Sequence, residues 1–249
     1  CSFNSNGNIL IVRFIMKIAS VSENKNNEKR ISITPEIAKK YISSGFEVVL
    51  PKNYGEHLGL SDDDYKNVGV VLNDDEKGII ESADLIVQLG LPSDDKLSLL
   101  KEKQILIGVL SPHSNKEKLN ELIQKKVDIF SLELLPRITR AQSMDILSSQ
   151  ANLAGYKAVI DSFANFEKAI PMMMTAAGTV AAAKVLVVGA GVAGLQAIAT
   201  AKRMGAIVFA TDVRLASKEQ VESLGGKFLV VEGAENLETE GGYAKETSD

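Results

Sequence analysis

The fold is decided by the stretch Lys184-Val185-Leu186-Val187-Val188-Gly189-Ala190-Gly191-Val192-Ala193-Gly194. A run with the apolar character of a buried strand leads directly into three glycines spaced Gly-x-Gly-x-x-Gly, and a helix of small residues follows over 195–204. Gly189 permits a tight turn, Gly191 lets backbone approach a pyrophosphate, and Gly194 lets the helix pack closely on the strand. The helix N-terminus offers N–H groups and a positive dipole end to phosphates. The pattern predicts dinucleotide binding; a purely structural turn is the alternative.

An acidic residue after the next apolar run strengthens this interpretation. Asp212 follows 207–211, which has the character of a second parallel strand. A carboxylate at that position accepts hydrogen bonds from the ribose hydroxyls of adenosine and repels a 2′-phosphate. Arg214, two residues later, is a hint of NADP. Because Asp212 stands at the strand end where the ribose contact belongs, the sequence favours NAD.

Length and composition restrict the class of protein. The chain has 249 residues, enough for one or two domains, and 45% of them are hydrophobic. The formal net charge of −4 argues against nucleic acid as the main partner, because phosphate binding needs a basic surface. Cys1 is the only cysteine, so an internal disulfide is impossible and a reducing compartment is favoured. His57 and His113 stand in polar loops as surface residues, and no metal site is expected.

The N-terminal segment offers no membrane span. The apolar run 9–12 is short, and Arg13 and Lys17 interrupt its continuation. Met16 begins a segment that has the form of a natural start running into a first strand. Residues 1–15 are therefore interpreted as an N-terminal extension.

Alternation of short apolar runs with charged helical segments predicts a first α/β domain over 16–141, Rossmann-like or flavodoxin-like, with a parallel sheet covered on both faces. Thr34 as N-cap and Pro35 at the first helical position mark the start of one helix. The strand candidates are 17–21, 47–50, 85–89, 105–110 and 129–132. The principal helix candidates are 35–44 and 115–126.

The alternation stops over 142–183, which is interpreted as a helical connection with helices at 151–166 and 175–183. A second α/β unit over 184–249 has strand candidates at 184–188, 207–211 and 227–231. Only the first half of a six-stranded dinucleotide domain fits there. The predicted fold is therefore α/β with two parallel-sheet lobes, the second a partial (truncated) Rossmann dinucleotide-binding unit. Residues 232–249 read as a mobile loop.

Several motifs occur in one order that resembles a known family. Besides the glycine loop they are Arg137-Ile138-Thr139-Arg140-Ala141-Gln142-Ser143-Met144-Asp145 with Ser148, Pro171-Met172-Met173-Met174-Thr175-Ala176-Ala177-Gly178-Thr179, Thr211-Asp212-Val213-Arg214 and Gly241-Gly242-Tyr243-Ala244-Lys245-Glu246. From about Met16 onward the chain resembles the NAD(H)-binding component (alpha subunit, domain I) of proton-translocating NAD(P) transhydrogenase. The family's component continues well past position 249, and residues 180–183 stand where it often has prolines.

The resemblance implies a role for each matched position. Around the nicotinamide end it places Arg137, Gln142, Asp145 and Ser148, of which the first three are the candidate catalytic residues. At the pyrophosphate it places Gly189, Ala190, Gly191, Val192, Ala193 and Gly194. Beside the adenosine ribose it places Asp212, Val213 and Arg214, and in a loop closing over the nucleotide it places Gly242 and Tyr243. Without the resemblance, 137–148 reads as a solvated loop with Ser143 or Asp145 as a helix cap.

The family transfers hydride directly from NADH to NADP⁺ held on a separate component, and proton movement through a membrane-spanning component drives the exchange. Direct transfer requires no general acid or base, only two nicotinamide rings held about 3–3.5 Å apart. The resemblance further implies a homodimer on the cytoplasmic side, peripheral on the inner face of the membrane through its partner subunits.

Two other functions remain as alternatives. Residues 26–35 also resemble alanine dehydrogenase, whose chemistry needs a lysine and a histidine. The matching positions here are Gln88 and Ser111, and neither an amide nor a hydroxyl replaces an imidazole base. The other alternative is a truncated, non-catalytic NAD-binding remnant.

Overall fold

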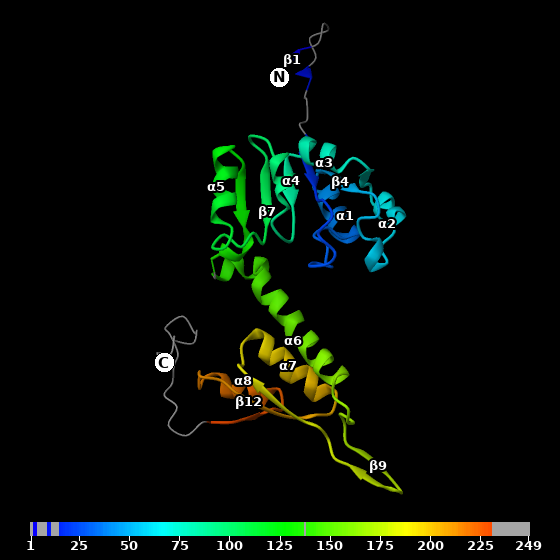
Figure 1. The fold of residues 1–249 in the computed structure, drawn as a ribbon, viewed down its shortest axis with the longest axis vertical. Helices are drawn as coiled ribbons and strands as arrows, with labels where there is room; N and C mark the ends of the chain where they lie inside the picture. The colour runs from blue at the N-terminus through cyan, green and yellow to red at the C-terminus, as the bar shows by residue number, and fades with distance from the viewer. Residues whose placement is uncertain (1, 4–8, 11–14, 137, 231–249) are drawn as a thin grey trace. The chain divides into compact units, whose positions relative to one another are not determined.

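The computed structural model describes residues 2–3, 9–10, 15–136 and 138–230 (Figure 1). It divides into two compact units, Cys1–Met144 and Asp145–Asp249. Near the N-terminus, β1 (Ser2–Phe3) and β2 (Ile9–Leu10) pair antiparallel. Among the described residues, no helix is long and apolar enough to cross a membrane. The predicted domain limits of 16–141, 142–183 and 184–249 stay predictions.

Unit 1 contains a six-stranded parallel sheet with the strand order β5-β4-β3-β6-β7-β8. The strands are β3 (Lys17–Ala19), β4 (Glu47–Pro51), β5 (Val71–Asn73), β6 (Leu85–Val87), β7 (Ile105–Gly108) and β8 (Asp128–Ser131). The first strand therefore lies inside the sheet with neighbours on both sides. This is the doubly wound order, and its switch point lies between β3 and β6.

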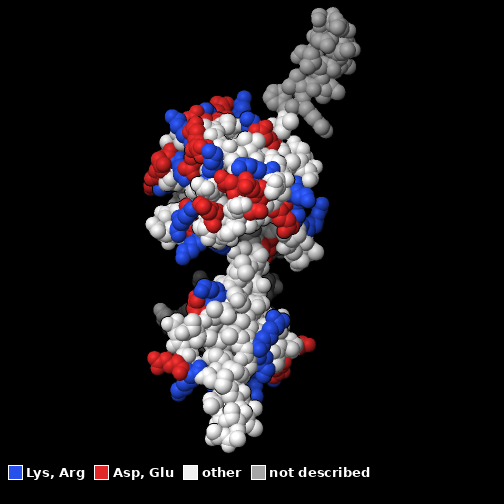
Figure 2. Space-filling model, turned by 90° about the vertical axis from the view of Figure 1, so that its right-hand side faces the viewer, with Lys and Arg blue, Asp and Glu red and all other residues white. Residues whose placement is uncertain are grey.

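Both faces of this sheet are buried, as a parallel sheet requires. Successive side chains of a strand point to opposite faces. Accordingly Ile18 and Val48 belong to one apolar cluster, and their neighbours Ala19 and Val49 belong to another. In the view of Figure 2 the outer surface of unit 1 shows Lys and Arg interspersed with Asp and Glu, and no continuous basic area appears on that face.

The helices of unit 1 begin where the sequence offers caps. Thr34 accepts a hydrogen bond from Ile37 N–H at the start of α1 (Pro35–Ser43), as predicted. Ser61 and Asp64 form a reciprocal capping box on α2 (Asp62–Asn67). The other helices are α3 (Glu76–Ser82), α4 (Asp94–Ser98) and α5 (Lys116–Gln124). Short 3-10 helices lie at η1 (Glu56–Leu58), η2 (Leu132–Leu134) and η3 (Thr139–Met144).

Unit 2 contains a three-stranded parallel sheet in the order β11-β12-β13. The strands are β11 (Lys184–Val188), β12 (Ile207–Thr211) and β13 (Lys227–Phe228), and the helices are α6 (Ile146–Ala164), α7 (Val192–Arg203) and α8 (Ser217–Ser223). The long helix α6 packs along α7 (Figure 1). The fold class is thus α/β with two parallel sheets, the second Rossmann-like, as predicted.

The prediction of a helix at 175–183 is wrong. β9 (Met173–Thr175) and β10 (Gly178–Val180) form an antiparallel hairpin there, with Thr175 opposite Gly178. The alanines suggested a helix, but Thr179 and Val180 are β-branched and favour a strand. Gly178 also has φ +139°, which no helix accommodates. The predicted helical connection 142–183 therefore contains α6 followed by a hairpin.

Candidate functional site

The glycine loop of unit 2 joins β11 to α7, and each glycine has its own geometric reason. Gly189 has φ +95°, a conformation that residues with a side chain rarely adopt. Gly191 is the N-cap of α7, and a Cβ added there would meet nothing within 4 Å. A Cβ on Gly194 would lie 1.8 Å from the Gly189 carbonyl oxygen. The loop is closely packed at Gly194 and open at Gly191, which suits the approach of a pyrophosphate.

Asp212 lies directly after β12 and binds the glycine loop. Its Oδ2 accepts a hydrogen bond of 2.6 Å from Ala190 N–H, and its Oδ1 accepts one of 2.8 Å from Arg214 N–H. The Arg214 guanidinium donates to the same carboxylate, from Nε to Oδ1 at 2.9 Å and from Nη2 to Oδ2 at 3.1 Å. A carboxylate offers about four acceptor positions. These four bonds occupy them, and the Asp212 side chain is only 6% exposed.

The charge state of Asp212 follows from these contacts. Burial by itself raises the pKa of the carboxyl, but the hydrogen bonds from Arg214 and from Ala190 N–H, together with the Arg214 charge, outweigh it. The net effect holds the pKa of Asp212 below its ordinary value. Asp212 is therefore an anion at neutral pH, and in this structure Arg214 is paired with it rather than held ready for a 2′-phosphate.

Two of the residues predicted at the nicotinamide end are in contact. Asp145 is the N-cap of α6: its Oδ1 accepts from Ser148 N–H at 3.0 Å, and its Oδ2 accepts from the Ser148 hydroxyl at 2.6 Å. Asp145 therefore does have the capping role that sequence alone suggested. Gln142 is exposed in η3 of unit 1. Arg137 lies outside the described residues.

Of the remaining predicted site residues, the structure describes one and not the other two. Val213 follows Asp212 and is exposed. Gly242 and Tyr243 lie outside the described residues. Over the part of the chain that the structure describes, no group of three or more His, Cys, Asp or Glu side chains is arranged to hold a metal ion.

At the switch point of unit 1, a buried polar network fills the carboxyl edge of the sheet, where ligands commonly bind in such folds. Gln88 is 3% exposed; its Oε1 accepts from the Ser20 hydroxyl at 2.6 Å and from Val21 N–H at 2.9 Å. The Ser20 hydroxyl also bonds the hydroxyls of Ser32 and Tyr54, each at 2.8 Å. Sequence analysis missed this network, although an amide directly after a buried strand was a signal for it.

The positions that alanine dehydrogenase would use hold no base. The Gln88 Nε2 donates to Val21 O and to Glu23 Oε1, so the whole amide is engaged. Ser111 has φ +48°, and its N–H donates to the Glu133 carboxylate. A neutral amide and a hydroxyl there supply no proton acceptor for oxidising an amino acid.

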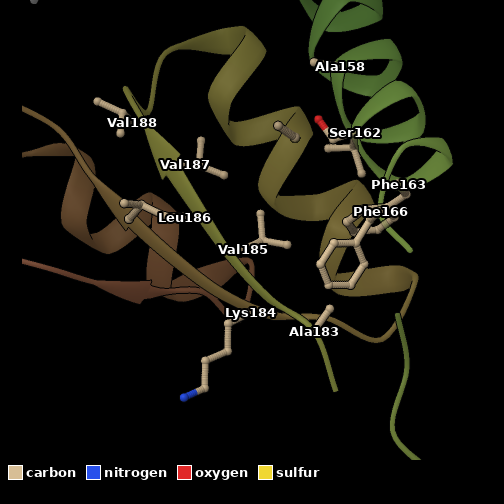
Figure 3. A pocket seen from close by; sticks show the side chains of 12 residues that line it. Ala158, Ser162, Phe163, Phe166, Ala183, Lys184, Val185, Leu186, Val187 and Val188 are labelled. Atoms are coloured by element: carbon tan, nitrogen blue, oxygen red, sulfur yellow. The ribbon is translucent and has the colours of Figure 1, made fainter. Parts of the chain in front are cut away.

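A groove of about 400 Å³ runs along β11, between that strand and the end of α6 (Figure 3). Val185 and Val187 point toward the helices, and Phe163 and Phe166 close the helical side. Its lining is mostly apolar, with Ser162 and Lys184 as the polar side chains, and it extends along the length of β11. It is thus distinct in chemistry from the glycine loop and is not the predicted phosphate site.

Comparison with known proteins identifies two matching family profiles. The one described as "Alanine dehydrogenase/PNT, N-terminal domain" matches residues 20–154, and "Alanine dehydrogenase/PNT, C-terminal domain" matches residues 158–246. Both units of the chain are therefore matched by the same family.

Individual relatives are named as alpha subunits of NAD(P) transhydrogenase. The alpha-subunit protein of Rhodospirillum rubrum is 48% identical over 241 residues, covering 94% of this chain and 63% of the relative. The protein of the same name from Rickettsia prowazekii is 49% identical over 237 residues, covering 94% and 62%. A solved structure, the transhydrogenase from Sinorhizobium meliloti, superposes with a TM-score of 0.81 at 47% identity, covering 86% of this chain and 64% of that one. The chain thus spans less than two thirds of the relatives it matches.

Proposed function

Because the chain belongs to the alanine dehydrogenase/PNT family, we propose that it is the NAD(H)-binding component of a proton-translocating NAD(P) transhydrogenase. The names of its relatives at 48–49% identity support this choice within the family. The observation that carries the proposal is the glycine loop bonded through Ala190 to the carboxylate of Asp212. That arrangement holds a phosphate-binding turn and a ribose acceptor side by side at the carboxyl edge of one sheet.

The proposed dinucleotide lies across residues 189–194, its pyrophosphate against the N-terminus of α7 and its adenosine ribose at Asp212. Since all four acceptor positions of Asp212 are taken, the ribose hydroxyls must displace the Arg214 guanidinium. Val213 and Arg214 then flank the ribose. The buried anion disfavours a 2′-phosphate, so the proposed ligand is NAD(H) rather than NADP(H).

At the other end, the proposed role of the protein is orientation. When bound, NADH supplies the hydride that passes to NADP⁺ on the partner component. Ser148 donates its hydroxyl proton to Asp145, so its oxygen remains an acceptor for a carboxamide N–H. Gln142 and Arg137 complete the orientation of the amide, and Gly242 and Tyr243 close over the nucleotide. No residue has to move a proton, because direct transfer needs only alignment of the two rings.

The partners follow from the same proposal. An NADP(H)-binding component and a membrane-spanning component complete the complex, and a second copy of this chain forms a homodimer. The location is cytoplasmic, peripheral on the inner face of the membrane through those partners. Within this scheme the chain neither pumps protons nor oxidises amino acids by itself.

Titration of the purified chain with NADH and with NADPH, by fluorescence and calorimetry, tests the proposal. We expect saturable binding of NADH that is clearly tighter than binding of NADPH. A well-folded chain that binds neither nucleotide would instead favour the non-catalytic remnant. An alanine-dependent reduction of NAD would favour the alanine dehydrogenase alternative.

The nicotinamide end needs a separate measurement. Gln142→Asn keeps the amide but shortens the side chain, so hydride transfer to the NADP(H) component should slow more than NADH binding weakens. Stopped-flow transfer rates and dissociation constants, compared with those of the unmodified protein, separate the two effects. If both values are unchanged, Gln142 belongs to the scaffold.

A further inference from the structure

Helix α6 contains one glycine, Gly155, and it lies buried against the first turn of α7. A Cβ added to Gly155 would stand 2.0 Å from the Ala193 carbonyl oxygen, 2.8 Å from its carbonyl carbon and 3.0 Å from its Cα. All three atoms are backbone, which cannot turn aside as a flexible side chain would. The two helices therefore meet backbone to backbone at this point.

Within the described residues, nothing else requires glycine at this position. Gly155 is not among the glycines with positive φ, so its backbone conformation is open to any residue. Glycine is also a poor helix former, and it stands in the interior of a 19-residue helix. The close approach to Ala193 is the feature that explains it.

This contact joins the two halves of the proposed NAD(H) site. Ala193 belongs to the glycine loop, while α6 begins at its cap Asp145 and carries Ser148 in its first turn. Ser148 lies seven residues before Gly155, which places both on one face of α6, roughly 10 Å apart along the axis. The position of the loop relative to Asp145 and Ser148 is thus set where α6 touches α7.

We propose that Gly155 is a positioning residue for the dinucleotide: by letting α6 rest on Ala193, it fixes the phosphate loop at the correct distance from Asp145 and Ser148. This inference depends on the proposed function, since it concerns the same site. A side chain at 155 must push the loop away from α6 by roughly 1.5 Å to reach ordinary contact distance. A ligand that contacts both halves then loses affinity, whereas one that contacts only the loop and Asp212 does not.

The test compares NADH with ADP-ribose, which lacks the nicotinamide, on the unmodified chain and on Gly155→Ala. We expect NADH binding to weaken by up to about tenfold, because the displaced loop breaks the proposed hydrogen bond from the carboxamide to Ser148, and ADP-ribose binding to change by less than about threefold. Ala154→Gly is the matched control: it changes the neighbouring, exposed residue of α6 and should leave both dissociation constants unchanged.

The outcomes separate the two proposals. If the unmodified chain does not bind NADH, the proposed function fails. Suppose instead that the unmodified chain binds NADH. If Gly155→Ala then keeps its affinity for both ligands, or loses affinity for both to the same extent, the positioning role is overturned while the proposed function stands. If Gly155→Ala does not fold, amide hydrogen exchange on the unmodified chain provides the test. Binding of ADP-ribose at the loop should slow the exchange of residues 153–157 in α6. An unchanged exchange rate there rejects the inference.

Discussion

Strand β3 of unit 1 and strand β11 of unit 2 are both the first strand of a parallel sheet, yet β3 is buried and β11 is exposed. β3 has neighbours on both sides, and its Ile18 is 3% exposed. Within the described residues β11 pairs only with β12, and its Leu186 and Val188 are 58% and 78% exposed. A first strand of this kind is thus buried or exposed depending on which later segments of the chain pack against it.

The carboxyl edges of the two sheets differ in a second way. In unit 1, side chains of Ser20, Tyr54 and Gln88 fill the switch point with mutual hydrogen bonds. In unit 2, Gly191 leaves the corresponding edge open, and the Asp212 carboxylate accepts a hydrogen bond from Ala190 N–H of the loop. The first edge is filled by side chains, whereas the second is open at Gly191, where the proposed nucleotide would bind.

The largest expected effect tests the difference in burial. Ile18→Ala should lower the free energy of unfolding of unit 1 by about 2–5 kcal/mol, because it leaves a cavity in a closed core. Leu186→Ala should change that of unit 2 by no more than about 0.5 kcal/mol. Hydrogen exchange measured separately for each unit gives both values. An equal cost at Leu186, growing with protein concentration, would mean that the open strand is covered by self-association.

A second test concerns the loop edge of unit 2. Asp212→Ala should weaken NADH binding by about 1.5–3 kcal/mol, because charge-assisted hydrogen bonds are lost. Arg214→Met is the paired variant: it should leave NADH binding equal or tighter, since the ribose no longer competes for the carboxylate. Calorimetric titration measures both. Weakening of similar size in the two variants would contradict the competition and would mean that Arg214 stabilises the bound nucleotide.

The third test concerns the filled edge of unit 1. Gln88→Met should destabilise unit 1 by about 1–3 kcal/mol, because it leaves buried donors and acceptors without partners. NADH affinity should not change. Gln124→Met, at an exposed position of α5, controls for the substitution itself and should be neutral within about 0.5 kcal/mol. A change in NADH affinity with Gln88→Met would assign the unit 1 edge to the site.

The smallest expected effect is a pH dependence of opposite sign in the two units. Burial raises the pKa of Glu23 above 4.5, against hydrogen bonds from Leu89 and Gly90 N–H that lower it. Its contribution to stability is therefore present at low pH and is lost as the pH rises from 4.5 through the raised value. The lowered pKa of Asp212 acts the other way: its contribution is present above 3.8 and is lost as the pH falls through the lowered value.

Unfolding free energies measured across this acidic range should separate the two groups. Glu23→Gln should remove the decrease in the free energy of unfolding as the pH rises. Asp212→Asn should remove the decrease as the pH falls. The unmodified chain serves as the reference for both variants. Profiles of both variants that match that of the unmodified chain would contradict the assigned pKa directions.

Much of this structure follows from local chemistry. Strand β11, the glycine loop and strand β12 were predicted because apolar runs, glycines and one aspartate encode their conformation within a few residues. The helix start at Pro35 is equally local, since Thr34 caps it directly. The hairpin at 173–180 was not predicted. A run of small residues is compatible with a helix or with a turn, and the pairing of β9 with β10 decides between the two.

The sequence by itself determined that a parallel strand leads into a phosphate-type glycine turn followed by an acidic residue, since each of these is a short-range property of the backbone. Only the tertiary structure decided that Arg214 pairs with Asp212, that Gln88 fills the carboxyl edge of the unit 1 sheet, and that Gly155 packs against the backbone of Ala193. Apart from Arg214, which lies close to Asp212 in the sequence, these contacts join residues that are far apart along the chain. Whether a polar group or a glycine is needed at such a place depends on what folding brings against it.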